Sequence, residues 1–304
     1  MTDPTAGPST ESPAVDGGRR PVRVVTDSTA DLPASIVGSL PIAVVPLLVS
    51  FGEETFRDGI DLSTADFAAR LRRSPQIPKT SQPPVSAFTD VFKPLLDAGF
   101  DIACVTIATG LSGTANAARL AAEALDPDRS RIRVVESQSA SMATGWCAVV
   151  AAERAESGGS LRQVTAAATD AISRYRLYAV LETLEYVYKG GRIGRASQMV
   201  GTMLSIKPVL CISEGVVQPV ERVRTWKKAL VRMAALCDAE GPFERLVILH
   251  CDNRADADHL ASLVSGSVTA APVHITSMGP VIGTYAGPGA IGFVGLLPAG
   301  RQAS

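Results

Sequence analysis

Residues 101–125, DIACVTIATGLSGTANAARLAAEAL, give the clearest indication of the fold class. The first eight of these residues, 101–108, form a nearly continuous apolar run, which predicts a strand covered on both faces, as in a parallel sheet. The turn at 109–114 (TGLSGT) follows, and an Ala-rich helix is predicted over 115–125. A strand, a turn and a helix in this order indicate an α/β unit. Ligands of open α/β sheets bind where such strands end, so this turn is a candidate site.

The same alternation extends over the first half of the chain. Short apolar strands are predicted at 22–26, 42–49 and 132–136. Helices are predicted between them, one of them capped by a serine, and residues 74–84 (SPQIPKTSQPP) are predicted to form a Pro-rich loop. We therefore expect residues 21–176 to form an α/β domain with a mostly parallel sheet. The predicted helices cover residues 63–73, 85–98, 141–157 and 160–174.

The second half has a different pattern. Strands are predicted at 177–183 and 208–213, and the Glu214–Gly215 turn predicts a hairpin with 216–220. A hairpin mixed with helices indicates an α+β domain with a mixed sheet over 177–298. The ends, residues 1–20 and 299–304, are predicted to be tails, and the first is rich in Pro, Gly, Ser and Thr, which is typical of disorder. Further elements are predicted as helices at 226–239 and 254–264, strands at 246–251 and 272–278, and a glycine-rich end.

Composition excludes several function classes. The 304 residues carry 29 Lys and Arg against 30 Asp and Glu, and 5% are aromatic, which argues against a nucleic-acid-binding protein. No run approaches the roughly 20 apolar residues of a membrane helix, and the first residues do not resemble a signal peptide. Five scattered cysteines indicate reduced thiols. We therefore expect a cytoplasmic protein that is not integral to a membrane.

Two hydroxyl-bearing loops are candidate anion sites. Thr80 and Ser81 lie in a rigid, Pro-flanked loop before a helix, where hydroxyls and helix N-terminal amides can hold an anion. Ser112 and Gly113 follow the strand at 101–108. The alternatives are a plain helix cap for the first loop and a plain tight turn for the second.

Other motifs give weaker signals. His250, His259 and His274 are isolated and lack metal-ligand spacing, and no catalytic triad is recognisable, so neither a metal nor a catalytic residue is predicted. GPGAIG at 287–292 fits a dinucleotide-binding spacing, but no βαβ unit has room to follow it. The basic segments 189–195 and 222–229 are either solvated surface or patches for an acidic or phosphate-bearing partner.

Taken together, the motifs resemble those of the DegV family, also called FakB-type fatty-acid-binding proteins. The resemblance covers residues 22–298. The motifs that carry it are, in chain order, TDSTADLP (26–33), RDGID (57–61), KTSQP (79–83), GLSGT (110–114), TLEYVYKGGRIG (183–194), IKPVL (206–210), RTWKKA (224–229) and GPVIGTYAGPGAIG (279–292).

The resemblance implies a protein that holds one long-chain fatty acid in a buried channel between its two domains. It implies that Thr80 and Ser112 bind the carboxylate, with Ser81 and Gly113 nearby, and that no cofactor is needed. Tyr285 occupies a position where the best-studied branch of the family carries histidine. Tyrosine can still donate a hydrogen bond, but it cannot supply a positive charge.

The resemblance also implies a partner. A separate ATP-dependent fatty-acid kinase would phosphorylate the presented carboxylate, and the acyl phosphate would feed phospholipid synthesis. Arg192 and Arg224 are expected to face that partner. Two alternatives stay open at this point: an acyl hydrolase with Ser112 as its nucleophile, and a regulator that senses lipid without delivering it.

Overall fold

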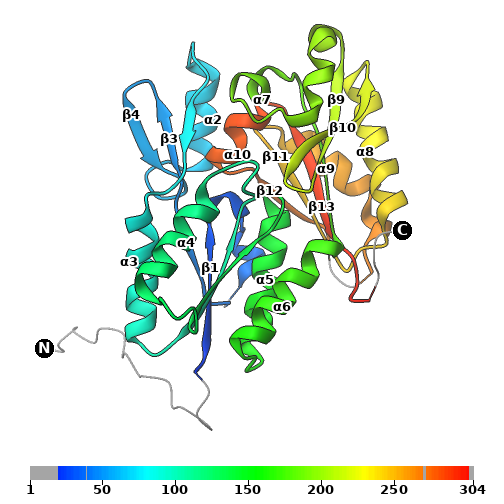
Figure 1. The fold of residues 1–304 in the computed structure, drawn as a ribbon. Coiled ribbons are helices and arrows are strands. Elements are labelled where there is room, and N and C mark those ends of the chain that lie inside the picture. The colour runs from blue at the N-terminus through cyan, green and yellow to red at the C-terminus, as the bar shows by residue number, and fades with distance from the viewer. Residues whose placement is uncertain (1–19, 39, 270–271, 301–304) are drawn as a thin grey trace, which may run out of the picture.

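The computed structural model describes residues 20–38, 40–269 and 272–300 (Figure 1). The predicted N-terminal tail, apart from Arg20, lies outside these residues, as do the last four residues of the chain.

The first sheet has four parallel strands in the order β2-β1-β6-β7. Its register pairs Val24 of the central strand β1 with Ile42 on one side and Ala103 on the other. The predicted parallel α/β sheet is therefore confirmed. The strand predicted over 42–49 is wrong in extent, because the chain leaves the sheet at Pro46 and begins another strand. The four strands are β1 (Val22–Asp27), β2 (Ile42–Val45), β6 (Asp101–Thr106) and β7 (Ile132–Glu136).

Helices cover both faces of this sheet. On one face α3 and α4 bury Phe88 and Phe92 against Val25 and Ile102. On the other face α5 lies under β1 and β6 and also reaches the second sheet, so it is buried along most of its length. These helices were predicted, and their bounds are α3 (Val85–Asp97), α4 (Thr114–Leu125), α5 (Met142–Glu156) and α6 (Leu161–Arg174).

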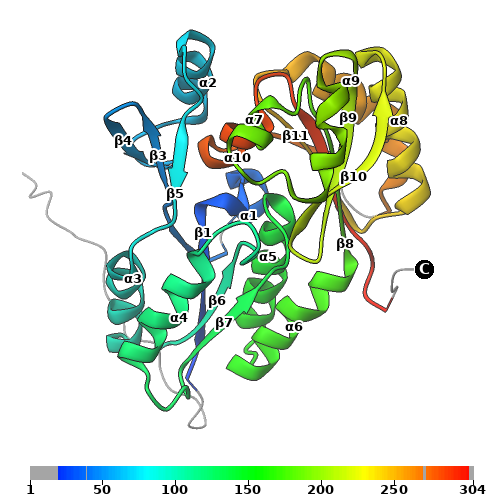
Figure 2. The same ribbon diagram turned by 45° about the horizontal axis from the view of Figure 1, so that its top comes forward.

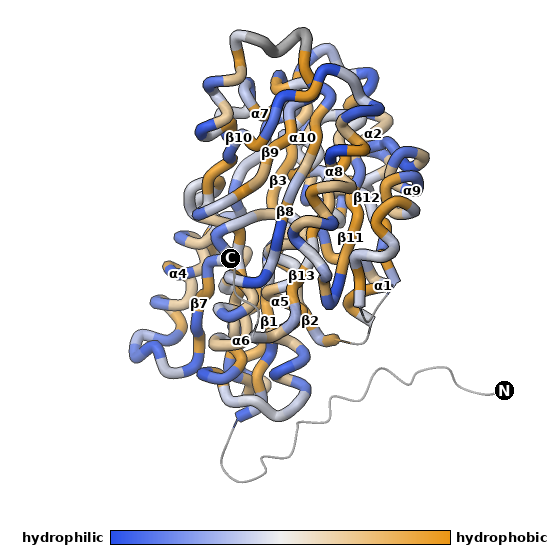
Figure 3. The backbone as a smooth tube through the Cα atoms, turned by 90° about the vertical axis from the view of Figure 1, so that its right-hand side faces the viewer, coloured by the Kyte–Doolittle hydropathy of each residue, from blue (hydrophilic) through white to orange (hydrophobic). Residues whose placement is uncertain are grey.

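The second sheet has six strands in the order β10-β9-β8-β13-β11-β12, and it is mixed, since only β11 and β12 run parallel. Helices α8 and α9 cover one face, and the other face lies toward α5 (Figure 1). In Figure 3 the apolar residues gather on central strands such as β11. The predicted mixed sheet is confirmed. Its elements are β8 (Tyr175–Val180), β9 (Lys207–Ser213), β10 (Val216–Val223), α8 (Trp226–Glu240), β11 (Arg245–His250), α9 (Arg254–Leu263), β12 (His274–Ser277) and β13 (Ile291–Leu296).

A small lobe between β2 and α3 was not predicted as a unit. It consists of an antiparallel sheet in the order β4-β3-β5 together with α2, and Figure 2 shows it standing clear of the first sheet. The predicted cap of α2 is confirmed, because the Ser63 side chain accepts a hydrogen bond from the Asp66 amide. The Pro-rich loop predicted over 74–84 is wrong at residues 79–81, where the chain forms β5. The lobe contains β3 (Leu48–Phe51), β4 (Glu54–Arg57), α2 (Thr64–Arg73) and β5 (Lys79–Ser81).

The glycine-rich C-terminal segment also differs from the expectation. It contains helix α10 (Pro280–Ala286), which begins with proline at its first turn, where the missing N–H costs nothing. The basic segment at 189–195 runs from the end of α7 through a short turn into η2. The remaining short elements are η1 (Ser28–Ala30), α1 (Ala34–Val37), α7 (Glu185–Lys189), η2 (Gly194–Ser205) and η3 (Ser265–Ser267).

Candidate functional site

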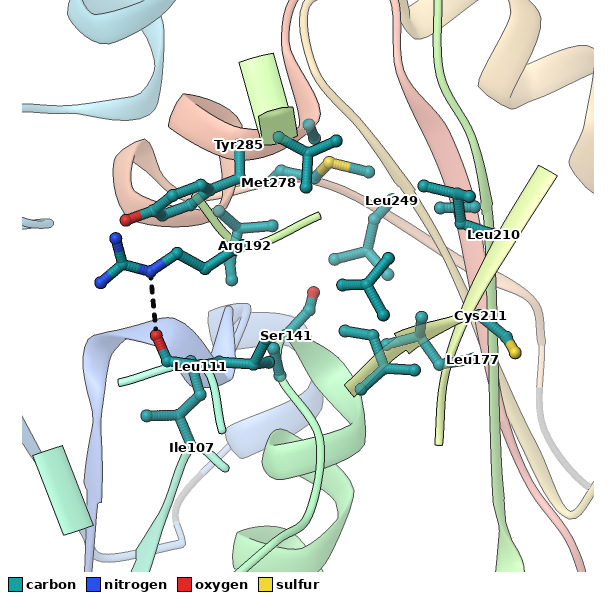
Figure 4. A pocket seen from close by; sticks show the side chains of 18 of the residues that line it. Ile107, Leu111, Ser141, Leu177, Arg192, Leu210, Cys211, Leu249, Met278 and Tyr285 are labelled. Atoms are coloured by element: carbon teal, nitrogen blue, oxygen red, sulfur yellow. Dashed lines mark hydrogen bonds between the residues drawn. The ribbon is translucent and has the colours of Figure 1, made fainter. Parts of the chain in front are cut away.

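A largely apolar cavity of about 180 Å³ lies between the two sheets (Figure 4). Its volume is many times the roughly 15 Å³ that one water molecule needs, so it is not an ordinary packing void. The walls come from both halves of the chain. Apolar side chains on the lining include Ile107, Leu111, Leu177, Leu181, Val187, Leu210, Ile212, Val217, Leu249, Met278, Ile282 and Val294.

Strand periodicity explains one wall. Alternate residues of a strand point to the same face, and Leu177 and Ala179 of β8 face the cavity together with Gly292 and Val294 of β13. The intervening residues, such as Phe293, pack under α8 and α9. At Gly292 an added Cβ would lie 2.9 Å from the Tyr178 carbonyl oxygen of the neighbouring strand, so a larger residue does not fit there.

Polar groups gather at one end of the cavity. The Thr80 hydroxyl and the Tyr285 hydroxyl lie 2.5 Å apart and share a hydrogen bond, although 205 residues separate them in the chain. The Ser112 hydroxyl lies 2.8 Å from the Thr114 hydroxyl. Figure 4 shows the Tyr285 hydroxyl on the opposite side of the cavity from Leu210 and Cys211. The cavity therefore has a polar end and an apolar end.

Arg192 is the one cation on the lining of this cavity among the described residues. Its Nε donates to the Leu111 carbonyl at 3.1 Å and its Nη1 donates to the Gly190 carbonyl at 2.8 Å. The guanidinium also lies 5.4 Å from the centre of the Tyr285 ring. The expectation placed Arg192 toward a protein partner, whereas the structure places it half-buried at the polar end of the cavity.

The two predicted loops contribute unequally. Thr80, Ser112 and Gly113 line the cavity, whereas Ser81 is exposed and does not, because successive residues of β5 point to opposite faces. Gln82, which was not predicted as a site residue, lines the cavity too. Its carboxamide lies so close to Gly113 that an added Cβ there would overlap the side-chain oxygen. The sequence feature that points to Gln82 is its place two residues after Thr80 in the TSQP motif.

A second, more polar cleft of about 670 Å³ adjoins the polar end. Thr80, Arg192 and Tyr285 line both the cavity and this outer cleft. Lys79 and Lys189 also line the outer cleft, and Lys189 pairs with Glu185 at 2.5 Å. The three shared side chains therefore stand between the apolar cavity and the outside.

Arg224, the other residue expected to face a partner, lies elsewhere. It is exposed between β10 and α8, and it lines neither the cavity nor the outer cleft. It immediately precedes Thr225, whose side chain caps α8.

The groups around Ser112 and Cys211 show what chemistry the cavity lining offers. The described hydrogen-bond partners of the Ser112 hydroxyl are the hydroxyl and the backbone amide of Thr114, and no histidine or carboxylate lines the cavity among the described residues. Burial raises the pKa of the Cys211 thiol, which disfavours the reactive thiolate. No group of three or more His, Cys, Asp or Glu side chains in the described part of the chain could hold a metal ion.

Comparison with known proteins identifies the relatives of this chain. The sequence profile of a family described as uncharacterised proteins of the DegV family matches residues 21–297. The chain belongs to the DegV family. A DegV domain-containing protein of Streptomyces coelicolor is 36% identical over 283 residues, which cover 90% of this chain and 98% of that relative. The Bacillus subtilis protein DegV is 29% identical over 275 residues, which cover 89% of this chain and 97% of DegV.

Solved structures of DegV proteins share the fold, and several of these proteins are described as binding fatty acids. A DegV family protein of Thermus thermophilus, described by its fatty-acid binding, superposes with a TM-score of 0.84 at 30% identity over 91% of this chain and all of that one. DegV of Bacillus subtilis, a fatty-acid-binding protein, gives a TM-score of 0.81 at 29% identity over 92% of this chain and all of that one. The Eubacterium eligens protein, loaded with heptadecanoic acid, gives 0.79 at 25% identity over 91% of this chain and all of that one. Along the described residues of this chain, no helix has the length and apolarity to cross a bilayer.

Proposed function

We propose that this protein binds one long-chain fatty acid in the cavity between the sheets, with the carboxylate at the polar end. The observation that carries the proposal is the polarity of the cavity itself. One end offers the hydroxyls of Thr80, Ser112 and Tyr285 with the Arg192 guanidinium, and the rest of the lining is mainly aliphatic. The fatty-acid binding of the Thermus thermophilus and Bacillus subtilis relatives supports the same ligand class.

The energetics of such a ligand fit this division of the cavity. Burying about fifteen methylenes at about 0.8 kcal/mol each gives about 12 kcal/mol before the costs of association. The apolar walls would therefore supply most of the affinity. The polar end would fix the orientation of the fatty acid, with its carboxylate at the mouth of the cavity, since a carboxylate left without partners in a buried site is costly.

We further propose that the protein is a carrier that presents its ligand to a separate ATP-dependent fatty-acid kinase, which forms the acyl phosphate for phospholipid synthesis. This places the protein in the cytoplasm, without a cofactor of its own. The outer cleft supports the proposal because it meets the cavity at the residues that would hold the carboxylate. Arg192 then belongs to the ligand site, and the exposed Arg224 remains the proposed contact with the kinase.

Lipid extraction and native mass spectrometry of protein expressed in bacteria test the ligand class. We expect one bound fatty acid per chain. A protein that stays empty and shows no saturable binding of added fatty acid would refute the proposal.

Transfer of phosphate from ATP to the bound ligand in the presence of a fatty-acid kinase tests the carrier role, and a pure lipid sensor would show no such transfer.

The double variant Thr80→Ala/Ser112→Ala tests the position of the head group. It removes two hydroxyls from the polar end, and hydrogen bonds to charged groups contribute about 1.5–3 kcal/mol each, so we expect fatty-acid affinity to fall at least tenfold. Ser81→Ala is the matched control, since Ser81 is the exposed neighbour of Thr80. Equal affinity and equal phosphorylation of the double variant and the wild type would show that the carboxylate binds elsewhere.

A further inference from the structure

Carboxyl groups from two parts of the fold meet at a buried junction below the small lobe. Asp27 and Asp31 flank η1 in the first domain, and Asp58 follows β4 of the lobe. Relative exposures of 0%, 9% and 4% show that all three are buried. Asp31 and Asp58 line a polar cleft of about 420 Å³, which also reaches Gly279 at the start of α10.

Asp31 connects both walls of the lipid cavity. One oxygen of its carboxyl accepts a hydrogen bond from the Ser141 hydroxyl at 2.6 Å, and the other accepts one from the Gly279 amide at 2.9 Å. Ser141 lines the cavity from the start of α5, and Met278, next to Gly279, lines it from the other domain. The contact to Gly279 is tight, because an added Cβ would lie 2.7 Å from the Asp31 carboxyl.

Asp58 adds the lobe to this junction. The Asp58 side chain forms part of the cleft wall. Its Oδ2 atom is nevertheless buried and has no hydrogen-bond partner among the described residues. The Asp58 amide donates to the Leu47 carbonyl at 2.9 Å, which fixes the residue at the base of the lobe. The hydrogen bond at the polar end of the cavity joins Thr80 on β5 of the lobe to Tyr285 on α10. Both of these elements are anchored at the junction, the lobe through Asp58 and α10 through Gly279 at its start.

The groups around the junction offer no compensating positive charge. Asp31 faces Asp27, Asp58 and the Cys251 thiol, and Asp27 faces the Cys104 thiol. α5 contributes a hydroxyl and the start of α10 a backbone amide, and no Lys, Arg or His lines the cleft among the described residues. Burial raises the pKa of Asp31 to about 8 and that of Asp58 to about 6. Hydrogen bonds from Ser141 and Gly279 to Asp31, and from Ser28 and Val281 to Asp58, oppose these shifts only in part, and the neighbouring carboxylates add to both.

We propose that Asp31 and Asp58 form a proton-dependent positioning site that holds α10 and the small lobe in the arrangement that closes the polar end of the lipid cavity. The inference rests on the proposed function, since it assigns a means of regulating the same cavity. When Asp31 carries its proton, it can hydrogen-bond both Ser141 and Gly279 without adding charge. When it ionises beside an ionised Asp58, two like charges share a buried site without a counter-ion, and the junction loosens.

The direction of the pH effect follows from linkage. The closed native form keeps the Asp31 proton up to about pH 8, whereas an exposed aspartate loses it near pH 3.8. The contribution of this proton to stability is therefore complete below pH 3.8 and is lost as the pH rises to about 8. Fatty-acid affinity should fall over the upper part of this range, since an opened junction separates Thr80 from Tyr285.

Binding of cis-parinaric acid, a fluorescent long-chain fatty acid, between pH 6.5 and 9.5 tests the proposal. We expect the wild-type Kd to rise by up to about 30-fold between pH 6.5 and pH 8, because the linked release of one proton limits the slope to tenfold per pH unit, and to level off above pH 8, where the closed form has itself lost the proton. Asp31→Asn should have a nearly flat profile. Asparagine suits the positive φ of 49° at this position and can still bond both Ser141 and Gly279.

Two further variants keep the test decisive. Asp58→Asn removes the neighbouring charge and should reduce the rise in Kd, and Asp61→Asn, at an exposed carboxyl paired with Arg57, should leave the wild-type profile unchanged. The melting temperature of the lipid-free protein, measured over the same pH range, should fall most steeply for the wild type and Asp61→Asn, less steeply for Asp58→Asn and least for Asp31→Asn. Failure of the wild type to bind the probe at pH 7 would overturn the proposed function and this inference together. Binding with parallel profiles for wild type and Asp31→Asn would overturn the inference alone.

Discussion

Tyr285 shows how a single residue shapes the polar end of the cavity. Its hydroxyl bonds Thr80 and its ring lies beside Arg192, so it joins α10 to the lobe and to the basic segment after α7. The ring also lies against Gly190, where an added Cβ would come within 2.6 Å of it. A phenol offers no positive charge, so Arg192 supplies the cationic character of this end.

Tyr285→Phe should weaken fatty-acid binding about 2- to 12-fold, the equivalent of one hydrogen bond of about 0.5–1.5 kcal/mol. The ring packing is retained, so the change isolates the hydroxyl. Competition with cis-parinaric acid measures the effect, and Tyr188→Phe on α7 is the control because that side chain is 50% exposed. An unchanged affinity for Tyr285→Phe would mean that the hydroxyl contacts neither the ligand nor a group that positions it.

The hairpin of β9 and β10 is the element that docks the second domain on the first. The Gly215 amide at its turn donates to the Gln138 carbonyl at 2.9 Å. The turn also lies against the 109–114 loop, since a Cβ on Gly110 would be 2.5 Å from the Gly215 carbonyl oxygen. Two backbone segments in such close contact leave no room for a side chain, and the loop they fix is the one that carries Ser112.

Gly110→Ala should therefore destabilise the protein by about 1–3 kcal/mol, the range of an overpacked contact that the structure cannot relax cheaply. We also expect faster release of bound fatty acid, because the loop that carries Ser112 must shift. Urea unfolding and stopped-flow displacement measure the two effects. Gly266→Ala is the matched control, since a Cβ there meets nothing within 4 Å. Equal urea midpoints for the two variants would contradict the docking role of the hairpin.

On the scale of the whole molecule, the cavity is part of the hydrophobic core. Leu181, Leu210 and Val217 of the second domain belong to the same buried cluster as Val105 and Trp146 of the first. The size of this cluster explains where many of the hydrophobic residues, 46% of the chain, are buried, although no helix among the described residues could span a membrane. A ligand in this cavity would contact both domains at once, so binding and stability should be linked.

Removal of the lipid should lower the melting temperature. At a free ligand concentration of one hundred times Kd, binding adds about 2.7 kcal/mol to the stability of the native state. Calorimetry of protein as purified, of delipidated protein and of delipidated protein with palmitate added back measures this effect. A melting temperature that does not respond to delipidation or to added palmitate would show that the cavity is not a fatty-acid site.

Much of the architecture could be predicted from periodicity, and its failures have physical causes. The apolar run at 101–108 predicted β6 because burial on both faces is a local property of the sequence. Strand β5 was missed because its three residues have no alternation of their own and pair with β3, about thirty residues earlier. Helix α10 was missed because Gly283 lies within it and Gly279 and Gly287 flank it, yet Gly283 is required there, since a Cβ would lie 2.6 Å from the Phe67 ring.

Patterns along the chain were enough to predict the two kinds of sheet and the resemblance to the DegV family, because both depend on the order and spacing of residues. The folded chain was needed to show that Arg192 lines the cavity, that Ser81 points away from it, and that Asp31 joins its two walls. The physical reason is distance along the chain. Contacts such as Thr80 with Tyr285, 205 residues apart, depend on how sheets and helices pack, and no local pattern records that packing.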